Sequence, residues 1–265
     1  MLRTRPAAVA GLFYPDDPGQ LAAEIDRYLD QAPAPAPASV PPCALIVPHA
    51  GVPYSGPVAA SAYRLLRPWA EQIHSVVILG PSHHLAFQGL ALPDCEAFET
   101  PLGRIEIDQA LAASLQQQDV IALAPNEAAH RLEHCLEVQL PFLQRLLKRF
   151  RLLPLLVGEA SSDAIAEVLA RLPPPPGCLL LISTDLSHYH PYEEAQRIDA
   201  DTSQRILALR PGLVGQQACG CRGLNGLLTL ARRQGLSIEQ LDLRNSGDTA
   251  GSRDRVVGYG AYLLH

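Results

Sequence analysis

The sequence has no apolar run close to the ~20 residues that a membrane-spanning helix requires. It also has no extended run of Lys and Arg, and 21 basic against 27 acidic side chains give a net charge of −6. Because phosphate backbones and anionic lipids attract basic surfaces, this balance argues against a nucleic-acid or membrane partner. The short apolar patch at the amino terminus runs into residues 13–17, FYPDD, so we expect no secretory signal.

The six cysteines form no Cys-x-x-Cys pair, the spacing typical of structural zinc sites. Only Cys219 and Cys221 lie close together, as Cys-Gly-Cys. A His-Glu-x-x-His motif of the zinc-protease type is absent as well. Scattered, unpaired cysteines are typical of proteins in a reducing compartment, so we expect a cytoplasmic protein.

The composition is that of a globular chain with a sizeable core, since 48% of the 265 residues are apolar and 18% are charged. Short apolar runs of buried-strand type alternate with helical patterns. This alternation predicts an α/β fold with a central mixed, largely parallel sheet flanked by helices on both faces. We expect a single domain over residues 1–265, in which the Pro/Ala-rich residues 32–42 form a surface connection.

The patterns also predict where the elements lie. The expected strands are residues 43–47, 75–79, 89–92, 103–107, 152–157, 178–183, 236–243 and 256–264. The expected helices are residues 18–31, 57–67, 108–118, 134–149, 161–171, 192–209 and 222–234. Pro141 predicts a kink or a late start for the helix that contains it.

Histidines follow three of the apolar strands. His49 follows CALIV, the pair His83–His84 follows SVVIL, and His188 follows CLLLIS. In open α/β sheets the ligand crevice lies outside the carboxyl ends of the strands, so parallel strands would deliver these imidazoles to one edge. Adjacent side chains diverge, so at most one of the His83–His84 pair is expected to point into the crevice. A histidine after a strand can also be an ordinary loop residue. Three others lack any such context, and we expect them to be ordinary surface or loop residues: His74, His130 and His265.

Converging histidines suggest a metal site, because neutral imidazole binds zinc, iron and copper. Two histidines with a third ligand and an open position form a catalytic arrangement. Asp185, Glu137 and Cys219 are the candidates for the third ligand. Glu137 follows His134 by three residues, which would place both on one helix face. Cys219 precedes the helix predicted over 222–234, where the helix dipole favours a thiolate.

Together these segments resemble the Memo family, whose bacterial members are called AmmeMemoRadiSam system protein B. The matching stretches span nearly the whole chain in the family's order: AVAGLFYP (8–15), IVPHAGVPYSG (46–56), ILGPSHH (78–84), TPLG (100–103), EHCLEVQLPFL (133–143), LLPLLVG (152–158), STDLSHY (183–189), ACG (218–220) and GYGAYLL (258–264). The combination of PHAG, GPSHH and STDLSH makes the resemblance specific.

The resemblance implies an α/β domain similar to class III extradiol dioxygenases, which use non-haem iron. It places the metal ligands at His49, His83 and Cys219. It also implies a pocket of further residues: His188 with Asp185 beside it as the acid/base pair, Tyr54 and Phe13 as aromatic lining, and His134 and Glu137 as residues that brace the site or line its rim and contact substrate.

The dioxygenases complete their site with a carboxylate, whereas this chain, like the Memo family, offers a cysteine. A thiolate is a softer ligand and favours copper, zinc or a differently tuned iron. We therefore expect a metal-dependent redox protein that uses iron or copper, with zinc possible, on a small substrate or dioxygen.

Two other functions stay open. The crevice could be vestigial and bind a peptide or small ligand without catalysis. Zinc hydrolysis would need a nearby general base such as Glu137. The family label also suggests two partners, a radical-SAM enzyme and an AMMECR1-type protein.

Overall fold

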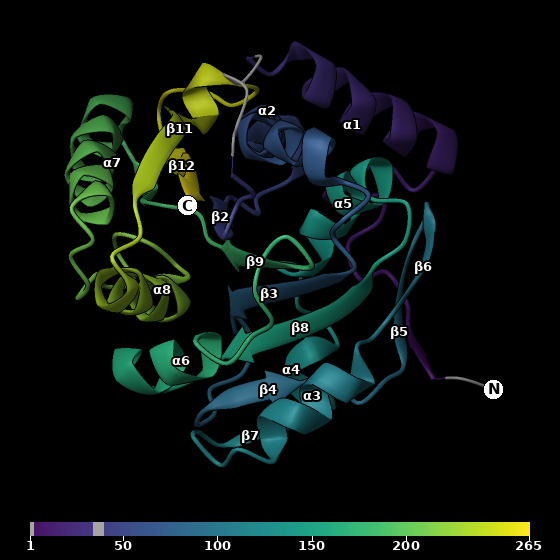
Figure 1. The fold of residues 1–265 in the computed structure, drawn as a ribbon. Helices are drawn as coiled ribbons and strands as arrows, with labels where there is room; N and C mark the ends of the chain where they lie inside the picture. The colour runs from purple at the N-terminus through teal and green to yellow at the C-terminus, as the bar shows by residue number, and fades with distance from the viewer. Residues whose placement is uncertain (1–2, 34–39) are drawn as a thin grey trace.

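Strands and helices alternate along the chain (Figure 1), and the computed structural model describes residues 3–33 and 40–265. The strands are β1 (Thr4–Arg5), β2 (Ala44–Val47), β3 (Ser75–Pro81), β4 (Leu90–Leu92), β5 (Ala97–Thr100), β6 (Gly103–Glu106), β7 (Leu123–Pro125), β8 (Arg151–Val157), β9 (Cys178–Ser183), β10 (His188–His190), β11 (Ile238–Asn245) and β12 (Val256–Leu264). The α-helices are α1 (Pro18–Gln31), α2 (Val52–Tyr63), α3 (Gln109–Gln116), α4 (Glu127–His130), α5 (Leu140–Leu146), α6 (Ser162–Leu169), α7 (Tyr192–Leu207) and α8 (Cys221–Gln234). Short 3-10 helices are η1 (Arg64–Trp69), η2 (Glu137–Gln139) and η3 (Ser246–Asp248).

The main sheet has a parallel centre and antiparallel flanks. Within the described residues its strand order is β10-β12-β2-β9-β3-β8-β4-β7, and β11 pairs with β12. β2, β9, β3 and β8 run parallel, whereas β12 pairs with β2 and β4 with β8 in the antiparallel sense. The mixed α/β sheet predicted from the sequence is confirmed. The carboxyl ends of β2, β9 and β3 consequently meet at one edge.

Both faces of the sheet are buried, which explains why its central strands are continuous apolar runs. In β2, Leu45 and Val47 contribute to one core together with side chains of α1, α2 and α5. Ala44 and Ile46 point the other way and pack with side chains of α6 and α8. Figure 1 shows α6, α7 and α8 gathered to the left of the sheet and α1, α2 and α5 at the upper right.

Two helices begin where their prolines allow. The sequence predicted a helix over 57–67, but α2 starts at Val52, follows Gly51 directly and contains Pro57 as an internal residue. The missing proline N–H removes one backbone hydrogen bond, which the buried face of α2 outweighs. α5 starts only at Leu140, with Pro141 in its first turn, so the late start was the correct alternative.

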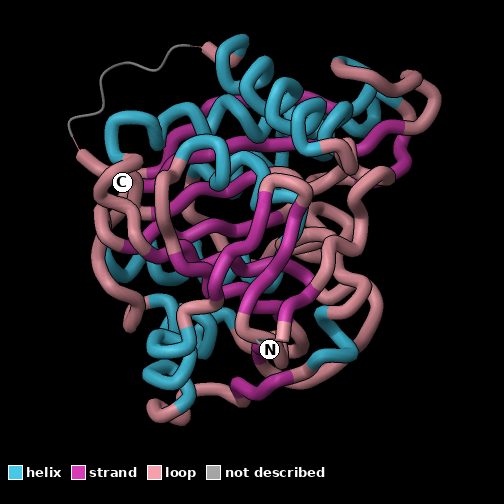
Figure 2. Tube along the Cα trace, turned by 90° about the vertical axis from the view of Figure 1, so that its right-hand side faces the viewer, coloured by secondary structure: helices cyan, strands magenta, loops and turns pink. Residues whose placement is uncertain are grey.

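A small second sheet escaped the sequence patterns. β1, β5 and β6 form it, and β5 was not predicted because its four residues alternate too briefly to be recognised. Figure 2 shows the β5–β6 hairpin toward the viewer. Of the expected surface connection 32–42, residues 34–39 lie outside the described part of the chain. No described helix has both the length and the apolar character needed to cross a bilayer.

His130 is buried, which corrects its assignment as an ordinary surface or loop residue. Its side chain lies at the end of α4, where Nε2 bonds the carbonyl oxygen of Ala91 at 2.9 Å. The carbonyl of His130 itself accepts a hydrogen bond from Arg5 Nε at 2.9 Å. Burial, only partly offset by the bond to Ala91, lowers the pKa of His130 from 6.5 to about 4. The imidazole is therefore neutral in the folded protein at pH 7.

This buried imidazole makes stability sensitive to acid. Between pH 6.5 and 4 the unfolded chain gains a proton on His130 that the folded protein does not take up, so stability falls as the pH falls. We predict that His130 accounts for a loss of roughly 2–3 kcal/mol between pH 7 and 4.5. Urea denaturation at both pH values should show a smaller loss in His130→Gln. The exposed His74→Gln should keep the wild-type dependence, and the same dependence in His130→Gln would contradict the account.

Candidate metal centre

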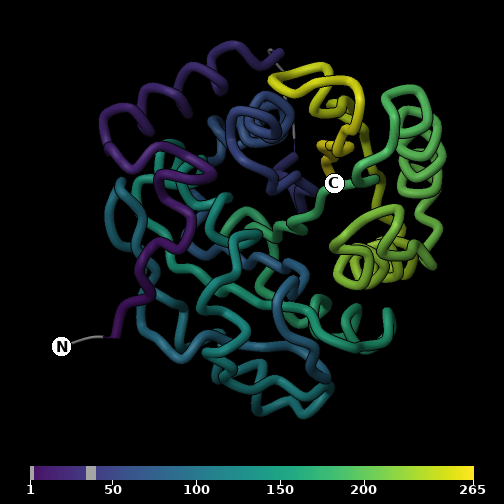
Figure 3. The backbone as a smooth tube through the Cα atoms, turned by 180° about the vertical axis from the view of Figure 1, so that it is seen from behind, coloured from purple at the N-terminus to yellow at the C-terminus, as the bar shows by residue number. Residues whose placement is uncertain are grey.

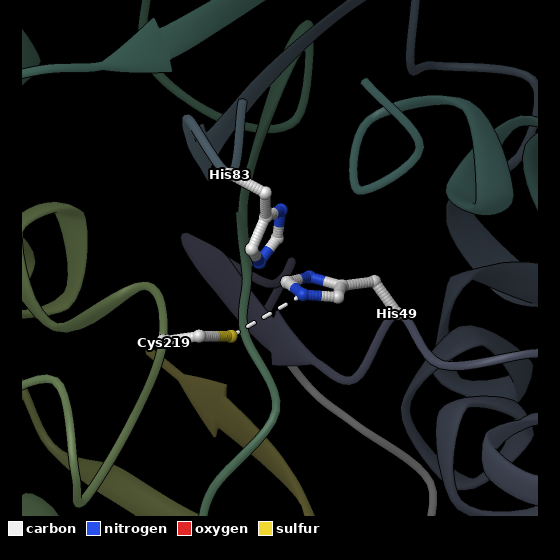
Figure 4. Close-up of side chains that lie close together, drawn as sticks. All are labelled: His49, His83 and Cys219. Atoms are coloured by element: carbon white, nitrogen blue, oxygen red, sulfur yellow. Dashed lines mark hydrogen bonds between the residues drawn. The ribbon is translucent and has the colours of Figure 1, made fainter. Parts of the chain in front are cut away.

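Two strand ends and one helix start bring the three candidate ligands together. His49 follows the end of β2, His83 follows the end of β3, and Cys219 lies two residues before α8. Because β2, β9 and β3 are parallel neighbours, their carboxyl ends present these loops side by side. Figure 4 shows the three side chains pointing toward one another from separate segments.

The hydrogen bonds of His49 fix its tautomer. Its buried ring bonds Ser183 Oγ through Nδ1 at 2.9 Å. Ser183 donates its only hydroxyl proton to the Cys135 carbonyl at 2.7 Å, so Nδ1 of His49 must be the donor. The lone pair of Nε2 is then free, and Nε2 lies 3.3 Å from Cys219 Sγ. Burial and the neighbouring His83 lower the pKa of His49 to about 3, so the ring is neutral.

His83 is held by a carboxylate that the sequence analysis did not single out. Glu133 accepts hydrogen bonds from the backbone N–H of His83 at 2.7 Å and from its Nδ1 at 2.8 Å. Burial raises the pKa of Glu133, but these hydrogen bonds outweigh burial and hold it well below its usual range. An ionised carboxylate only accepts, so Nδ1 carries the proton and Nε2 of His83 is free to bind a metal.

Cys219 is held by the backbone of Asp185. Its Sγ accepts the Asp185 N–H at 3.2 Å, and its own N–H donates to the Asp185 carbonyl at 3.2 Å. Glycine at position 220 lets the backbone after Cys219 pack closely against the end of β9, because a Cβ there would lie 2.8 Å from the Ser183 carbonyl oxygen. Burial and the Asp185 carboxylate raise the pKa of Cys219 to about 12. The thiolate therefore needs a bound cation to form at neutral pH.

These residues fit a metal ion. One donor atom from each of His49, His83 and Cys219 lies within 4.8 Å of the others. In both imidazoles the Nδ1 atom is already engaged in a hydrogen bond, as in metal-ligating histidines generally. Two nitrogens and one sulfur suit iron, copper or zinc, and three protein ligands leave a position open.

His134 belongs to the same cluster. Its ring stacks on His83 with centroids 4.8 Å apart, meets the edge of His49 at 5.4 Å and contacts Phe13 at 4.7 Å. Burial and the adjacent His49 lower the pKa of His134 to about 4. A third imidazole and an aromatic ring, both expected near the site from the family resemblance, therefore adjoin the two histidine ligands.

Asp185 has a different role from the one expected. Its Oδ1 accepts the backbone N–H groups of His49 at 2.7 Å and Ala50 at 3.3 Å. Among the described residues, no hydrogen bond joins this carboxylate to His188. Asp185 thus holds the His49 loop and the Cys219 backbone rather than orienting His188. The half-buried His188 begins β10 and lies near enough to His49 to influence its pKa.

Of the two alternatives expected for Glu137, its surroundings favour bracing of the site, because a fully buried carboxylate does not line a rim. It is fully buried and pairs with Arg5 Nη1 at 2.7 Å. Its carboxylate also accepts the Val9 N–H at 3.0 Å and the Tyr14 hydroxyl at 2.6 Å. Figure 3 shows the purple amino-terminal segment crossing the teal part of the chain on its way to α1. Glu137 holds that segment, which includes Phe13, in place.

The shared helix face of His134 and Glu137 is also absent. Residues 133–136 form no helix, and Glu137 begins the 3-10 helix η2. Glu133, the first residue of the EHCLEVQ stretch, draws the backbone N–H groups of His134 and Cys135 to its own carboxylate at 3.0 and 3.2 Å. These two hydrogen bonds hold residues 133–136 in a non-helical conformation, so the helical part begins only at Glu137.

A small cavity adjoins the cluster. Its volume is about 260 Å³, and its lining includes His83, His84, Phe87, Glu159 and Arg222. His84 is exposed, as expected for the diverging member of the His83–His84 pair. Tyr54, in the first turn of α2, is 42% exposed. The cavity leaves room for a small molecule beside His83.

The role of Glu133 leads to a direct prediction. Glu133→Gln can no longer accept two hydrogen bonds from His83 as an anion, so the ring loses its fixed orientation. We expect metal affinity, measured by competition with a chromophoric chelator, to fall about 10–100-fold. The exposed Glu127→Gln serves as the matched control and should bind as the wild type does. Equal affinity of Glu133→Gln and Glu127→Gln would refute the assignment.

Known proteins are similar to this chain over nearly its whole length. A family model described as Memo-like protein matches residues 5–263. A MEMO1 family protein of Methanopyrus kandleri is 35% identical over 286 residues, with 98% of each chain covered. MEMO1 family proteins of Aquifex aeolicus and Thermoplasma volcanium are 34% and 32% identical, with at least 97% of each chain covered. The chain therefore belongs to the Memo family.

Proposed function

We propose that the protein is a metal-dependent redox enzyme that binds iron or copper through His49, His83 and Cys219. The observation that carries this proposal is the orientation of the two imidazoles. Ser183 and Glu133 engage their Nδ1 atoms, so both free nitrogens are available beside the Cys219 sulfur. A purely structural role for these histidines would not require three donors to converge within 4.8 Å.

The two nitrogen donors and the sulfur donor limit which metals the site would favour. A thiolate ligand favours copper or iron over hard cations such as magnesium, with zinc also compatible. Bound at an open site, iron or copper would supply one-electron chemistry and a position for dioxygen or a substrate oxygen. Asp185 and Gly220 hold the cysteine close to His49, so the chain's part is to fix the three donors before any metal arrives.

Proton transfer would fall to His134 and His188. His134 stacks on His83, and burial keeps it neutral at pH 7, so it is able to accept a proton from a substrate beside that ring. His188 begins β10 and lies near enough to His49 and Asp185 to influence their pKa values, and we propose it as the second acid/base group. Phe13, Tyr54 and the 260 Å³ cavity favour a small, partly aromatic substrate.

A binding module is the second candidate, and the exposed tyrosines favour it. Tyr54 and Tyr189 are 42% and 63% exposed, and both lie near enough to the buried Tyr259 to raise its pKa. Exposed aromatic side chains of this kind suit a peptide ligand. Zinc hydrolysis is disfavoured, because the general base it needed, Glu137, is buried and paired with Arg5.

The cellular compartment of the protein and its partner proteins are part of the proposal as well. All six cysteines are unpaired in the structure, which supports a reducing compartment such as the cytoplasm. A radical-SAM enzyme and an AMMECR1-type protein remain proposed partners on the strength of the family label alone.

Elemental analysis tests the proposal. The protein is purified without oxygen and without metal-affinity resin, beside His49→Ala, Cys219→Ser and the control Cys43→Ser, whose half-buried thiol lies before β2. We expect about one iron or copper per chain in the wild type and in the control, and less than about a tenth of that in the two site variants. An oxygen-uptake screen with catechols then follows on the metal-loaded protein.

Failure to retain metal, or to take up added Fe(II) or Cu(I), would overturn the redox proposal. The binding module would then be favoured, and a peptide or small ligand whose binding requires His83 would support it. Zinc as the only retained metal, without oxygen uptake, would count against redox chemistry as well.

A further inference from the structure

A second, larger cavity lies at the opposite edge of the sheet. Its volume is about 950 Å³. It is formed where β3 and β8 begin, between β6 and the carboxyl end of α5 (right-hand part of Figure 1). Its lining combines charged and apolar side chains, among them Arg104, Arg149, Arg151, Leu102 and Phe150.

This cavity is separate from the metal centre. Ser75 pairs with Arg151 at the first position of the parallel β3–β8 ladder, and Pro81 pairs with Val157 at the last. The cavity adjoins the first pair, whereas His83 follows the last. Seven residues of strand put about 20 Å between the two ends. A ligand in this cavity would therefore not contact the donors of the metal centre.

The cavity concentrates positive charge in an acidic protein. Arg104 from β6 joins Lys148, Arg149 and Arg151, which precede or begin β8. Lys148 is the only lysine of the chain and pairs with Glu71. Among the described residues, the other three guanidinium groups have no carboxylate within 4.0 Å. The sequence pattern missed this patch because its members come from two elements and form no long basic run.

The acidic residues of the cavity, Glu106 and Asp108, form no ion pair with these guanidinium groups among the described residues. Asp108 caps α3 by accepting the Leu111 N–H at 3.1 Å, and its second oxygen accepts the Ser75 hydroxyl at 3.0 Å. Glu106 is exposed and forms no ion pair within the described residues. Like charges gathered in a hollow repel each other and raise the local potential for anions. A bound anion would relieve that repulsion.

Part of the cavity wall is apolar. Ile105 and Leu147 are buried, and Leu102 and Phe150 are half-buried and lie at the same surface. The volume lies at the upper end of the range for small-molecule sites, about 300–1,000 Å³, and far exceeds what a single phosphate ion fills. Arginine matches phosphate with paired N–H donors, which a lysine ammonium does not provide.

We propose that this cavity binds a phosphorylated small molecule of nucleotide size, independently of the metal centre. Arg104, Arg149 and Arg151 would bind the phosphate groups, and Leu102 and Phe150 would pack against the apolar or aromatic part. Binding then requires both the negative charge of the phosphate groups and the apolar or aromatic part of the ligand. This double requirement distinguishes such a ligand from inorganic anions.

Calorimetric titration of the full chain with ATP and with inorganic tripolyphosphate tests this proposal. We compare the wild type with Arg149→Gln/Arg151→Gln and with the control Arg210→Gln/Arg232→Gln, whose two arginines are exposed elsewhere. ATP should bind the site variant at least tenfold more weakly and the control within twofold of the wild type. Because all four side chains are exposed, the variants should melt at the wild-type temperature.

Three results would overturn the proposal. The first is no saturable ATP binding by the wild type at millimolar concentration, including the case in which only a long polyanion such as heparin binds. The second is equal ATP affinity in the site variant and the control. The third is tripolyphosphate binding as tightly as ATP, because the apolar wall would then play no part. Unchanged ATP affinity in Cys219→Ser would support the independence of the two sites.

Discussion

Three buried carboxylates hold the loops that form the metal centre, and the geometry of the site depends on them. Asp185 accepts the backbone N–H groups of His49 and Ala50, and Glu133 accepts those of His83, His134 and Cys135. Glu137 does the same for the amino-terminal segment, with Arg5 as its counterion. A loop buried at the end of a parallel sheet leaves backbone donors without partners, and burying an unpaired donor is costly. A carboxyl group accepts several hydrogen bonds at once, so each of these side chains satisfies more than one donor and fixes its loop.

The same contacts set the chemistry of the histidines. Glu133 reaches the Nδ1 atom of His83 and Ser183 reaches that of His49, so each ring presents its other nitrogen to the open edge. Burial then keeps both His49 and His134 neutral. Cys219 differs from the two histidines, because its raised pKa keeps it a protonated thiol until a cation binds. Metal binding and ionisation of this cysteine are thus one coupled event.

Sequence patterns marked the central strands and the histidines that follow them, because an apolar run and the residues at its end are local signals. Apolar runs marked β2, β3 and β9, and the imidazoles that follow β2 and β3 meet as the parallel order requires. The family resemblance supplied Cys219, which spacing alone left equal to Asp185 and Glu137. Long-range partners were out of reach: nothing local tells that Glu133 bonds a histidine fifty residues away or that Glu137 pairs with Arg5. The start of α2 at Val52 was missed because Pro57 reads as a boundary.

X-ray absorption at the metal edge tests the central claim most directly, with the wild-type protein loaded with one equivalent of zinc as a redox-inert probe. The account predicts one sulfur at about 2.3 Å and two imidazole nitrogens at about 2.0–2.1 Å. Cys219→Ser should lose the sulfur and keep the nitrogens. A wild-type spectrum with oxygen neighbours alone, or a sulfur signal that survives in Cys219→Ser, would contradict the assignment of His49, His83 and Cys219 as a metal centre.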